Sequence, residues 1–150
     1  WLVGEGPYRP TLWKQVKHFD LTGQIIFPGS FDDLTDVLQA ADLFVLPCYD
    51  EVSSTTLLQA MAAEVPVVTT DTSQHRQLIV QGKQGLLVPV RDVHALTEAI
   101  LQVLADPESA ARRAALARRI VQQQYSVDRM VSQHLQLFER LIAEKSSTNG

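Results

Sequence analysis

Residues 41–70 read ADLFVLPCYDEVSSTTLLQAMAAEVPVVTT, and this stretch decides the fold. It holds two short apolar runs, residues 43–46 and 67–69, separated by a segment with apolar residues at helical spacing. Parallel strands need a crossover of a dozen or more residues, usually a helix, and strands covered on both faces are continuously apolar. The stretch is therefore typical of a strand, helix, strand unit within a parallel sheet.

The same pattern continues on both sides of this unit. Further short β-rich runs occur at residues 2–3, 25–27 and 86–88, and the runs recur about every 20 residues, which leaves room for one helix each time. The sequence thus predicts an α/β fold, a Rossmann-like doubly wound parallel sheet.

Three helices are expected after the last strand run. Asp106 and Pro107 predict the start of the second of them, as N-cap and first helical residue, and Ser126 predicts the N-cap of the third. The third carries an apolar stripe, which consists of Met130, Val131, His134, Phe138, Leu141 and Ile142.

Composition places the chain among globular proteins. Its 150 residues are 45% hydrophobic and 20% charged, which excludes a disordered or fibrous chain. Thirteen Lys and Arg against seventeen Asp and Glu give a net charge of -4, which disfavours broad binding of nucleic acid. The single cysteine, Cys48, cannot form an intramolecular disulfide, and no apolar run is long enough to span a bilayer, so we expect a cytoplasmic protein.

Ligands of an open parallel sheet bind beyond the carboxyl ends of the strands, so the loops that leave the strands are candidate sites. The richest is residues 47–56, PCYDEVSSTT, which leads directly into a helix. N–H groups at a helix start, beside Ser and Thr hydroxyls, favour a phosphate. The alternative is that Ser53 or Ser54 simply caps the helix.

Other candidates are weaker. A nucleophilic Cys48 would need a base such as His75 or Asp71 nearby, and no sequence spacing supports one, so we interpret Cys48 as a structural, partly buried thiol. Residues 4–7, GEGP, lack the third glycine of a dinucleotide fingerprint and predict a tight turn. The scattered histidines have no metal-ligand spacing, so no metal is expected.

Taken in order, several motifs resemble a known family, the nucleotide-binding C-terminal half of GT-B glycosyltransferases of the family 4 type. They are residues 4–7 (GEGP), 27–29 (FPG), 41–47 (ADLFVLP), 57–63 (LLQAMAA), 66–71 (PVVTTD) and 82–88 (GKQGLLV). The resemblance implies transfer of a sugar from a nucleotide-sugar donor to an acceptor, with retention of anomeric configuration. It implies neither a metal nor another cofactor, because the nucleotide sugar is a substrate.

The resemblance also implies roles for particular residues. Glu51 matches the first of the family's two acidic positions, close to the donor sugar, and is the expected catalytic residue. Gln59 stands where the second acid would contact the ribose, so ribose binding is expected to be weaker. The helix start at Ser53, Ser54 and Thr55 would hold the diphosphate. The other expected donor-binding residues, of which those after Phe27 would border the base, are Gly4, Gly29, Ser30 and Phe31.

The chain departs from the family pattern at further positions. Residues 52–54 (VSS) replace a glycine-rich stretch, Glu64 replaces a glycine, Ser73 and Gln74 replace a glycine pair, and Gln77 replaces an acid. Each glycine replacement is expected to narrow backbone freedom or to add a side chain close to the phosphates.

The implied protein is longer than this chain. Residues 1–150 would form a single donor-binding domain that begins at Trp1, without its first strand and without the N-terminal acceptor domain. Its expected partners are the nucleotide sugar and a glycan or lipid-linked acceptor held by the missing domain, without nucleic acid. Peripheral contact with the inner face of the membrane, in polysaccharide or cell-envelope biosynthesis, is a further expectation. The rival interpretation is an inactive GT-B subunit that serves as a binding or scaffold module, and it is favoured by Val52, Gln59, Glu64 and Gln77.

Overall fold

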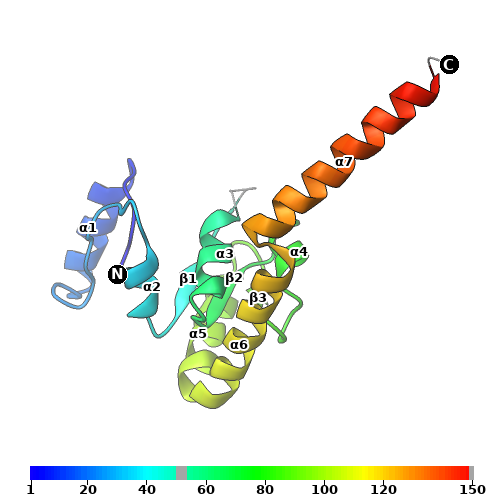
Figure 1. Cartoon of the computed structure of the whole chain (residues 1–150). Coiled ribbons are helices and arrows are strands. Elements are labelled where there is room, and N and C mark those ends of the chain that lie inside the picture. The colour runs from blue at the N-terminus through cyan, green and yellow to red at the C-terminus, as the bar shows by residue number, and fades with distance from the viewer. Residues whose placement is uncertain (50–53, 149–150) are drawn as a thin grey trace. The chain divides into compact units, whose positions relative to one another are not determined.

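The computed structural model describes residues 1–49 and 54–148. The chain divides into two compact units, Trp1–Leu34 and Thr35–Gly150. Figure 1 shows the helices and strands assigned in the described residues.

The first unit is built around helix α1 (Arg9–His18), which has Pro10 in its first turn. Proline is tolerated there because the first N–H groups of a helix have no carbonyl partner within it. Val16 is the buried residue of α1, and the ring of Trp13 meets the ring of Phe27 edge-on, with the ring centroids 5.6 Å apart. These contacts join α1 to the segment that follows it.

The strands predicted at residues 2–3 and 25–27 do not form as regular strands. Within Trp1–Leu34, all of which is described, the N–H of Leu2 donates to the carbonyl of Ile26 at 2.9 Å, and Val3 forms a single parallel bridge with Gly29, just after the second segment. Parallel pairing is weaker per residue than antiparallel pairing, and two such short segments have no third strand beside them within this unit. Val3 accordingly remains 43% exposed.

The second unit contains a parallel sheet with the strand order β1 (Phe44–Leu46), β2 (Val67–Thr70) and β3 (Leu86–Val88). Phe44 pairs with Val67, and Val68 pairs with Leu86. All four residues of β2 are buried because β2 lies between the other two strands, whereas the residues of β1 are half-buried. These strands and the helices between them confirm the predicted Rossmann-like α/β class.

The described residues of this unit form six helices: α2 (Thr35–Gln39), α3 (Thr55–Ala62), α4 (His75–Leu78), α5 (Val93–Ala105), α6 (Pro107–Gln124) and α7 (Val127–Thr148). The predicted start of α6 is confirmed, since the Asp106 carboxylate accepts the N–H of Ser109 at 2.9 Å and Pro107 follows it. The predicted cap of α7 is confirmed as well, because the Ser126 hydroxyl accepts the N–H of Arg129 at 3.3 Å.

The core lies between the sheet and helices α3, α5 and α6 (Figure 1). Val68 of β2 packs in a cluster with Ala99 and Val103 of α5. Helix α6 turns small side chains toward α3, which lets the two helices approach closely, and its buried residues are Ala110, Ala114, Ala117 and Val121. On α3 the buried residues are Leu57, Ala60 and Met61, each 0% exposed.

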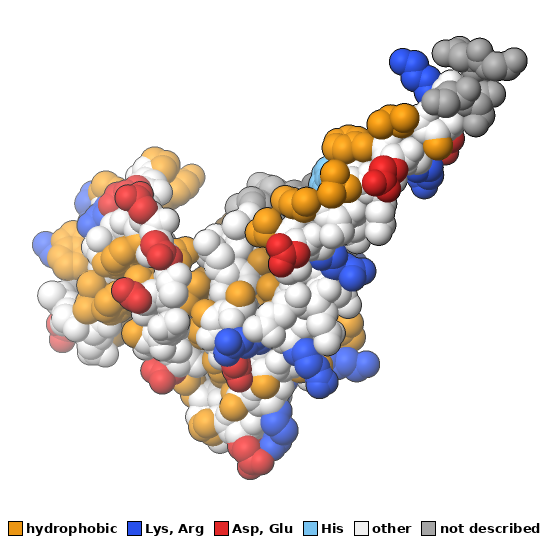
Figure 2. Space-filling view, viewed as in Figure 1, with side chains coloured by type: hydrophobic (Ala, Val, Ile, Leu, Met, Phe, Trp, Pro, Cys, Tyr) orange, Lys and Arg blue, Asp and Glu red, His pale blue; other side chains and the backbone are white. Residues whose placement is uncertain are grey.

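Helix α7 is apolar along one side and yet exposed. Figure 2 shows this apolar stripe, and residues 127–145 are all exposed. Among the described residues, no helix has both the length and the apolar character needed to cross a membrane.

Candidate functional site

The carboxyl ends of β1, β2 and β3 point to one edge of the sheet because the strands are parallel. A hollow of about 40 Å³ lies at this edge, and its lining consists of Pro47, Tyr49, Thr70, Val88, Pro89, Arg91, Asp92, Val93 and Leu96. Ligand pockets are typically about 300 to 1,000 Å³, so this hollow is too small for a nucleotide. The loops around it, and not the hollow itself, are the candidate site.

Helix α3 begins at this edge, after the loop that leaves β1. Ser54 occupies the N-cap of α3, as the capping alternative expects, but its side chain makes no capping hydrogen bond. Capping by Ser53 stays untested, because Ser53 lies outside the described residues. Thr55 and Gln59 are four residues apart and both exposed, which places them on one face of α3, away from the buried Leu57 and Met61. The structure therefore brings three of the predicted donor-binding residues together along one helix.

Two predicted residues of this loop, Glu51 and Ser53, lie outside the described residues, as does Val52. The described chain ends before them at Tyr49 and resumes after them at Ser54. The role predicted for Glu51 therefore stays a prediction.

The other predicted donor-binding residues lie in the first unit. The N–H of Gly4 donates to the carbonyl of Gly29 at 2.7 Å, so the two glycine loops lie side by side. Both glycines have positive φ, +120° and +88°, which L side chains rarely adopt. Ser30 and Phe31 follow Gly29, and both are exposed. The tight turn was predicted at residues 4–7, and the turn that the structure closes lies two residues later, where the carbonyl of Gly6 accepts the N–H of Arg9 at 3.2 Å.

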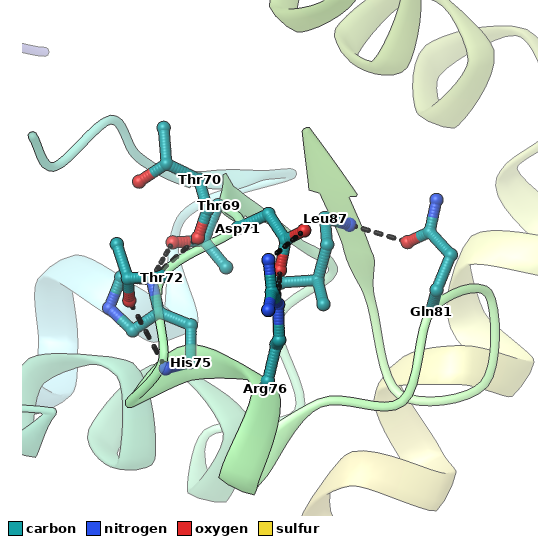
Figure 3. A network of polar contacts seen from close by, with 8 residues as sticks. All are labelled: Thr69, Thr70, Asp71, Thr72, His75, Arg76, Gln81 and Leu87. Atoms are coloured by element: carbon teal, nitrogen blue, oxygen red, sulfur yellow. Dashed lines mark hydrogen bonds and ion pairs between the residues drawn. The ribbon is translucent and has the colours of Figure 1, made fainter. Parts of the chain in front are cut away.

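A buried polar network holds the turn after β2 (Figure 3). His75 is 1% exposed, and its Nδ1 lies 2.8 Å from the Thr70 carbonyl and 2.9 Å from the Thr69 hydroxyl. A carbonyl can only accept, so Nδ1 carries the proton and donates to it. The Thr69 hydroxyl donates in turn to the Leu46 carbonyl at 2.8 Å. His75 thereby connects α4 to β2, and through Thr69 to β1.

Asp71 and Arg76 form an ion pair on the exposed side of the same turn. The hydrogen bond from Arg76, helped by its charge, lowers the pKa of Asp71, against a smaller opposing effect of burial. The same pair raises the pKa of Arg76. The ion pair with Arg76 therefore stabilises the charged carboxylate form of Asp71.

These contacts bear on Cys48, which lies two residues before the segment that the structure does not describe. Both candidate bases for it are engaged elsewhere, His75 in the buried network and Asp71 with Arg76. Burial raises the pKa of the Cys48 thiol, which disfavours the nucleophilic thiolate. The structure agrees with the interpretation of Cys48 as a structural, partly buried thiol.

Of the two effects expected of the glycine replacements, Glu64 agrees with the narrowing of backbone freedom and not with a side chain close to the start of α3. Glu64 follows the end of α3, which runs from the carboxyl edge of the sheet back toward the start of β2 at Val67. Its φ is +62°, and its Oε2 accepts a hydrogen bond from Nη1 of Arg118 at 2.7 Å. Glu64 therefore adopts the left-handed backbone conformation that glycine usually takes after a helix, and its side chain links the end of α3 to α6. Of the other replacements, Gln77 is exposed on α4.

Sequence reasoning assigned no role to Thr70, Arg76 or Arg91, although all three lie at the carboxyl edge. The sequence signal that could have indicated a role for Arg76 is an acidic residue, Asp71, five residues before it. Arg91 and Thr70 carry no such local signal, because their contacts are with residues distant in sequence. Within residues 1–49 and 54–148, no three side chains of His, Cys, Asp or Glu gather as metal ligands.

Comparison with known proteins decides the family. The family model described as "Glycosyl transferases group 1" matches residues 1–106. The chain belongs to this family. The resemblance read from the motifs of the sequence is thereby confirmed, and so is the assignment to the C-terminal part of such enzymes.

Individual relatives agree with this family. The lipopolysaccharide core biosynthesis glycosyltransferase LpsE of Rhizobium meliloti is 30% identical over 91% of this chain and 40% of its own length. Among solved structures, sucrose-phosphate synthase from Thermosynechococcus elongatus matches with a TM-score of 0.85 and 29% identity, over 95% of this chain and 38% of that one. Anabaena Alr3699/HepE in complex with UDP matches in fold, with a TM-score of 0.83 and 24% identity over 94% of this chain and 40% of that one. The chain spans about two fifths of the length of these relatives.

Proposed function

We propose that this chain is the donor-binding part of a retaining glycosyltransferase that transfers a hexosyl group from a nucleotide sugar to an acceptor. Membership of the group 1 glycosyl transferase family carries the proposal. The solved structure of a fold relative that holds UDP supports a nucleoside diphosphate as the recognised group.

The diphosphate would bind at the start of α3. The first N–H groups of a helix lack partners within it and carry a partial positive charge, which suits an anion. Ser54 leaves its hydroxyl uncommitted to capping, and Thr55 and Gln59 share the exposed face that leads away from this end. Ser53 would add a hydroxyl to the diphosphate, and Gln59 would contact the ribose.

Glu51 would contact the donor sugar as the catalytic residue. Transfer leaves a nucleoside diphosphate, whose growing negative charge the start of α3 would stabilise. The loops of Gly4 and Gly29, joined by their hydrogen bond, would border the nucleotide together with Ser30 and Phe31. No metal or other cofactor is part of this proposal.

The acceptor, a glycan or a lipid-linked glycan, would bind to a second half of the protein, outside residues 1–150. The proposal places transfer in the cytoplasm, with peripheral contact at the inner face of the membrane, and involves no nucleic acid. Residues 1–150 would form one donor-binding domain of that longer protein, and alone they would not turn over donor and acceptor.

Titration calorimetry of the chain with UDP, GDP and ADP, each against its nucleoside, tests donor binding. We expect one diphosphate to bind more tightly than its nucleoside. Thr55→Glu should weaken this binding, because it places a negative charge at the start of α3. Thr97→Glu makes the same charge change on the exposed side of α5 and should leave it unchanged. If none of the three diphosphates binds, the donor assignment is wrong.

Catalysis is tested in a protein that carries this chain together with an acceptor-binding half. Glu51→Ala should lower kcat/KM at least about tenfold, which corresponds to about 1.4 kcal/mol of lost transition-state stabilisation. An unchanged rate, or diphosphate binding without any transfer by the wild type, would favour an inactive scaffold subunit instead.

A further inference from the structure

The side chain of Arg9 joins the Gly4 loop (residues 4–7) to the Gly29 loop (residues 27–31) within the first unit. Its Nη1 donates to Oε1 of Glu5 at 2.6 Å, and its Nη2 donates to the carbonyl of Phe27 at 3.1 Å. Glu5 belongs to the Gly4 loop, and Phe27 is the first residue of the Gly29 loop. The rigid fork of one guanidinium therefore bonds both loops.

The Glu5 carboxylate lies directly against the backbone of Gly29. A Cβ at Gly29 would come within 3.1 Å of Oε1 of Glu5, the same atom that accepts the hydrogen bond from Arg9. The absence of a side chain at Gly29 thus leaves the space that this carboxylate occupies. The backbone bond from Gly4 to Gly29 lies beside this contact, so the two loops meet through both side chains and backbone.

The ring of Phe27 gives Arg9 a third contact. The guanidinium carbon of Arg9 lies 5.8 Å from the centroid of this ring, and Trp13 of α1 meets the same ring edge-on. An exposed ion pair contributes little by itself because water competes with it, and the side chains of Arg9 and Glu5 are 41% and 57% exposed. A carboxylate, a backbone carbonyl and a ring together, however, fix the orientation of the guanidinium.

We propose that Arg9 is a positioning residue for the nucleotide, because it holds the Gly4 loop and the Gly29 loop in the arrangement that the nucleotide meets. The proposal rests on the proposed function, which assigns the diphosphate to the start of α3 and the rest of the nucleotide to these two loops. Loops that are ordered before the ligand arrives lose less entropy on binding. Arg9 therefore raises the affinity for the nucleoside part without contacting the phosphates.

The variants separate this role from the general effect of losing an ion pair. Arg9→Met removes the guanidinium and keeps an unbranched side chain, and Glu5→Ala removes the carboxylate that it bonds. Arg112→Met is the matched control, because Arg112 also pairs with a glutamate four residues before it, Glu108, on the exposed side of α6. Neither end of that pair belongs to a loop assigned to the nucleotide.

The binding measurement is titration calorimetry of the 150-residue chain. The ligands are whichever of UDP, GDP and ADP binds the wild type, and the nucleoside of that diphosphate. Arg9→Met should raise both dissociation constants at least about threefold and by the same factor, with an unchanged number of sites. A partly unfolded variant would instead lower the number of sites. Thr55→Glu should differ, because it weakens the diphosphate and spares the nucleoside.

Two further results are expected from the same set of variants. Glu5→Ala should also weaken binding, and the double variant should bind no more weakly than Arg9→Met, because the two side chains act as one unit. Hydrogen exchange of the Gly4 amide, which donates to the Gly29 carbonyl, should be at least about threefold faster in Arg9→Met. Arg112→Met should match the wild type in both measurements.

A change of less than threefold in the diphosphate Kd of Arg9→Met would overturn the proposal, and so would an equal loss in Arg112→Met. A loss confined to the diphosphate would also contradict it, because Arg9 would then act on the phosphates directly. If the wild type binds none of the three diphosphates, it is the proposed function that has failed. Binding by the wild type that Arg9→Met leaves unaltered would refute the role of Arg9 alone.

Discussion

The side chains of Asp71 and Arg76 meet in a two-bond ion pair across the turn between β2 and α4. Nε of Arg76 lies 2.5 Å from Oδ1 of Asp71, and Nη2 lies 2.9 Å from Oδ2. The backbone N–H of Asp71 also donates to the carbonyl of Val88 at 2.7 Å, so the backbone of Asp71 joins the turn to the end of β3. Such a planar fork suits a guanidinium and a carboxylate in one orientation.

Asp71→Asn should make the stability of the protein less dependent on pH in the acid range. The pair lowers the pKa of Asp71 in the folded state, so its stabilisation is fully present above the ordinary Asp pKa of about 3.9. It is lost as the pH falls through the lowered pKa of the folded state. The difference in unfolding free energy between wild type and variant should therefore be constant near neutral pH and should shrink in acid, as urea unfolding at several pH values can show. Arg76→Met should produce the same change, and the double variant should add nothing further. A difference that grows in acid would contradict the assignment.

Gly85→Ala should destabilise the second unit by about 1 to 3 kcal/mol, the usual cost of an inserted methyl in a close-packed region. A Cβ at Gly85 would lie 2.9 Å from the carbonyl oxygen of Val67, in the neighbouring strand β2, and 3.3 Å from Cδ1 of Ile79. Neither the paired backbone nor the buried Ile79 can move aside cheaply. Gly6→Ala is the control, because a Cβ there meets nothing within 4 Å. Urea denaturation measures both, and equal stabilities of the two variants would show that the strands can separate to admit the methyl.

Met61→Ala and Phe138→Ala should differ sharply, although both remove a large apolar side chain. Met61 is 0% exposed between α3 and its neighbours, so its removal should cost about 2 to 5 kcal/mol. Phe138 is 54% exposed on α7, and its removal should change the free energy of unfolding of the chain by no more than about 0.5 kcal/mol. A cost at Phe138 comparable to that at Met61 would mean that the stripe of α7 is covered in solution.

Gln59→Glu should raise the affinity of the chain for its nucleoside diphosphate. If Gln59 faces the ribose, a carboxylate replaces a neutral acceptor, and charge-assisted hydrogen bonds are about twice as strong as neutral ones. A gain of about 1 kcal/mol, or about fivefold in Kd, is expected after the cost of removing water from the carboxylate. Calorimetric titration of both proteins with the same diphosphate measures the gain. Equal or weaker binding by the variant would show that Gln59 does not contact the ribose.

The structure confirms the parts of the fold that depend on local patterns. The strands at Phe44, Val67 and Leu86 were predictable because continuous apolar runs of that length have to be covered on both faces. The start of α6 at Asp106 and Pro107 was predictable because a capping carboxylate and a proline act within one helical turn. The family followed from the order of these motifs, which the match over residues 1–106 confirms.

Local sequence patterns could not predict which residues pair when they are far apart in the sequence. Residues 2–3 have the composition of a strand, yet they form a single bridge, because a strand becomes regular only when neighbours cover it. Glu64 was expected either to narrow backbone freedom or to add a side chain close to the phosphates, and the direction of α3 favours the first, because it carries Glu64 to the opposite edge of the sheet and to Arg118.

By itself, the sequence determined the class of fold, the family and the segment that carries Glu51. The spacing of apolar residues, the helix caps and the order of the motifs can all be read from residues that are neighbours in the chain. Only the tertiary structure decided that Thr70 bonds Cys48, that Arg91 stacks on Tyr49 and that His75 is buried against β2. Each of these contacts joins residues that leave different strands or helices. They meet because parallel strands bring their carboxyl ends to one edge, whatever the length of chain between them.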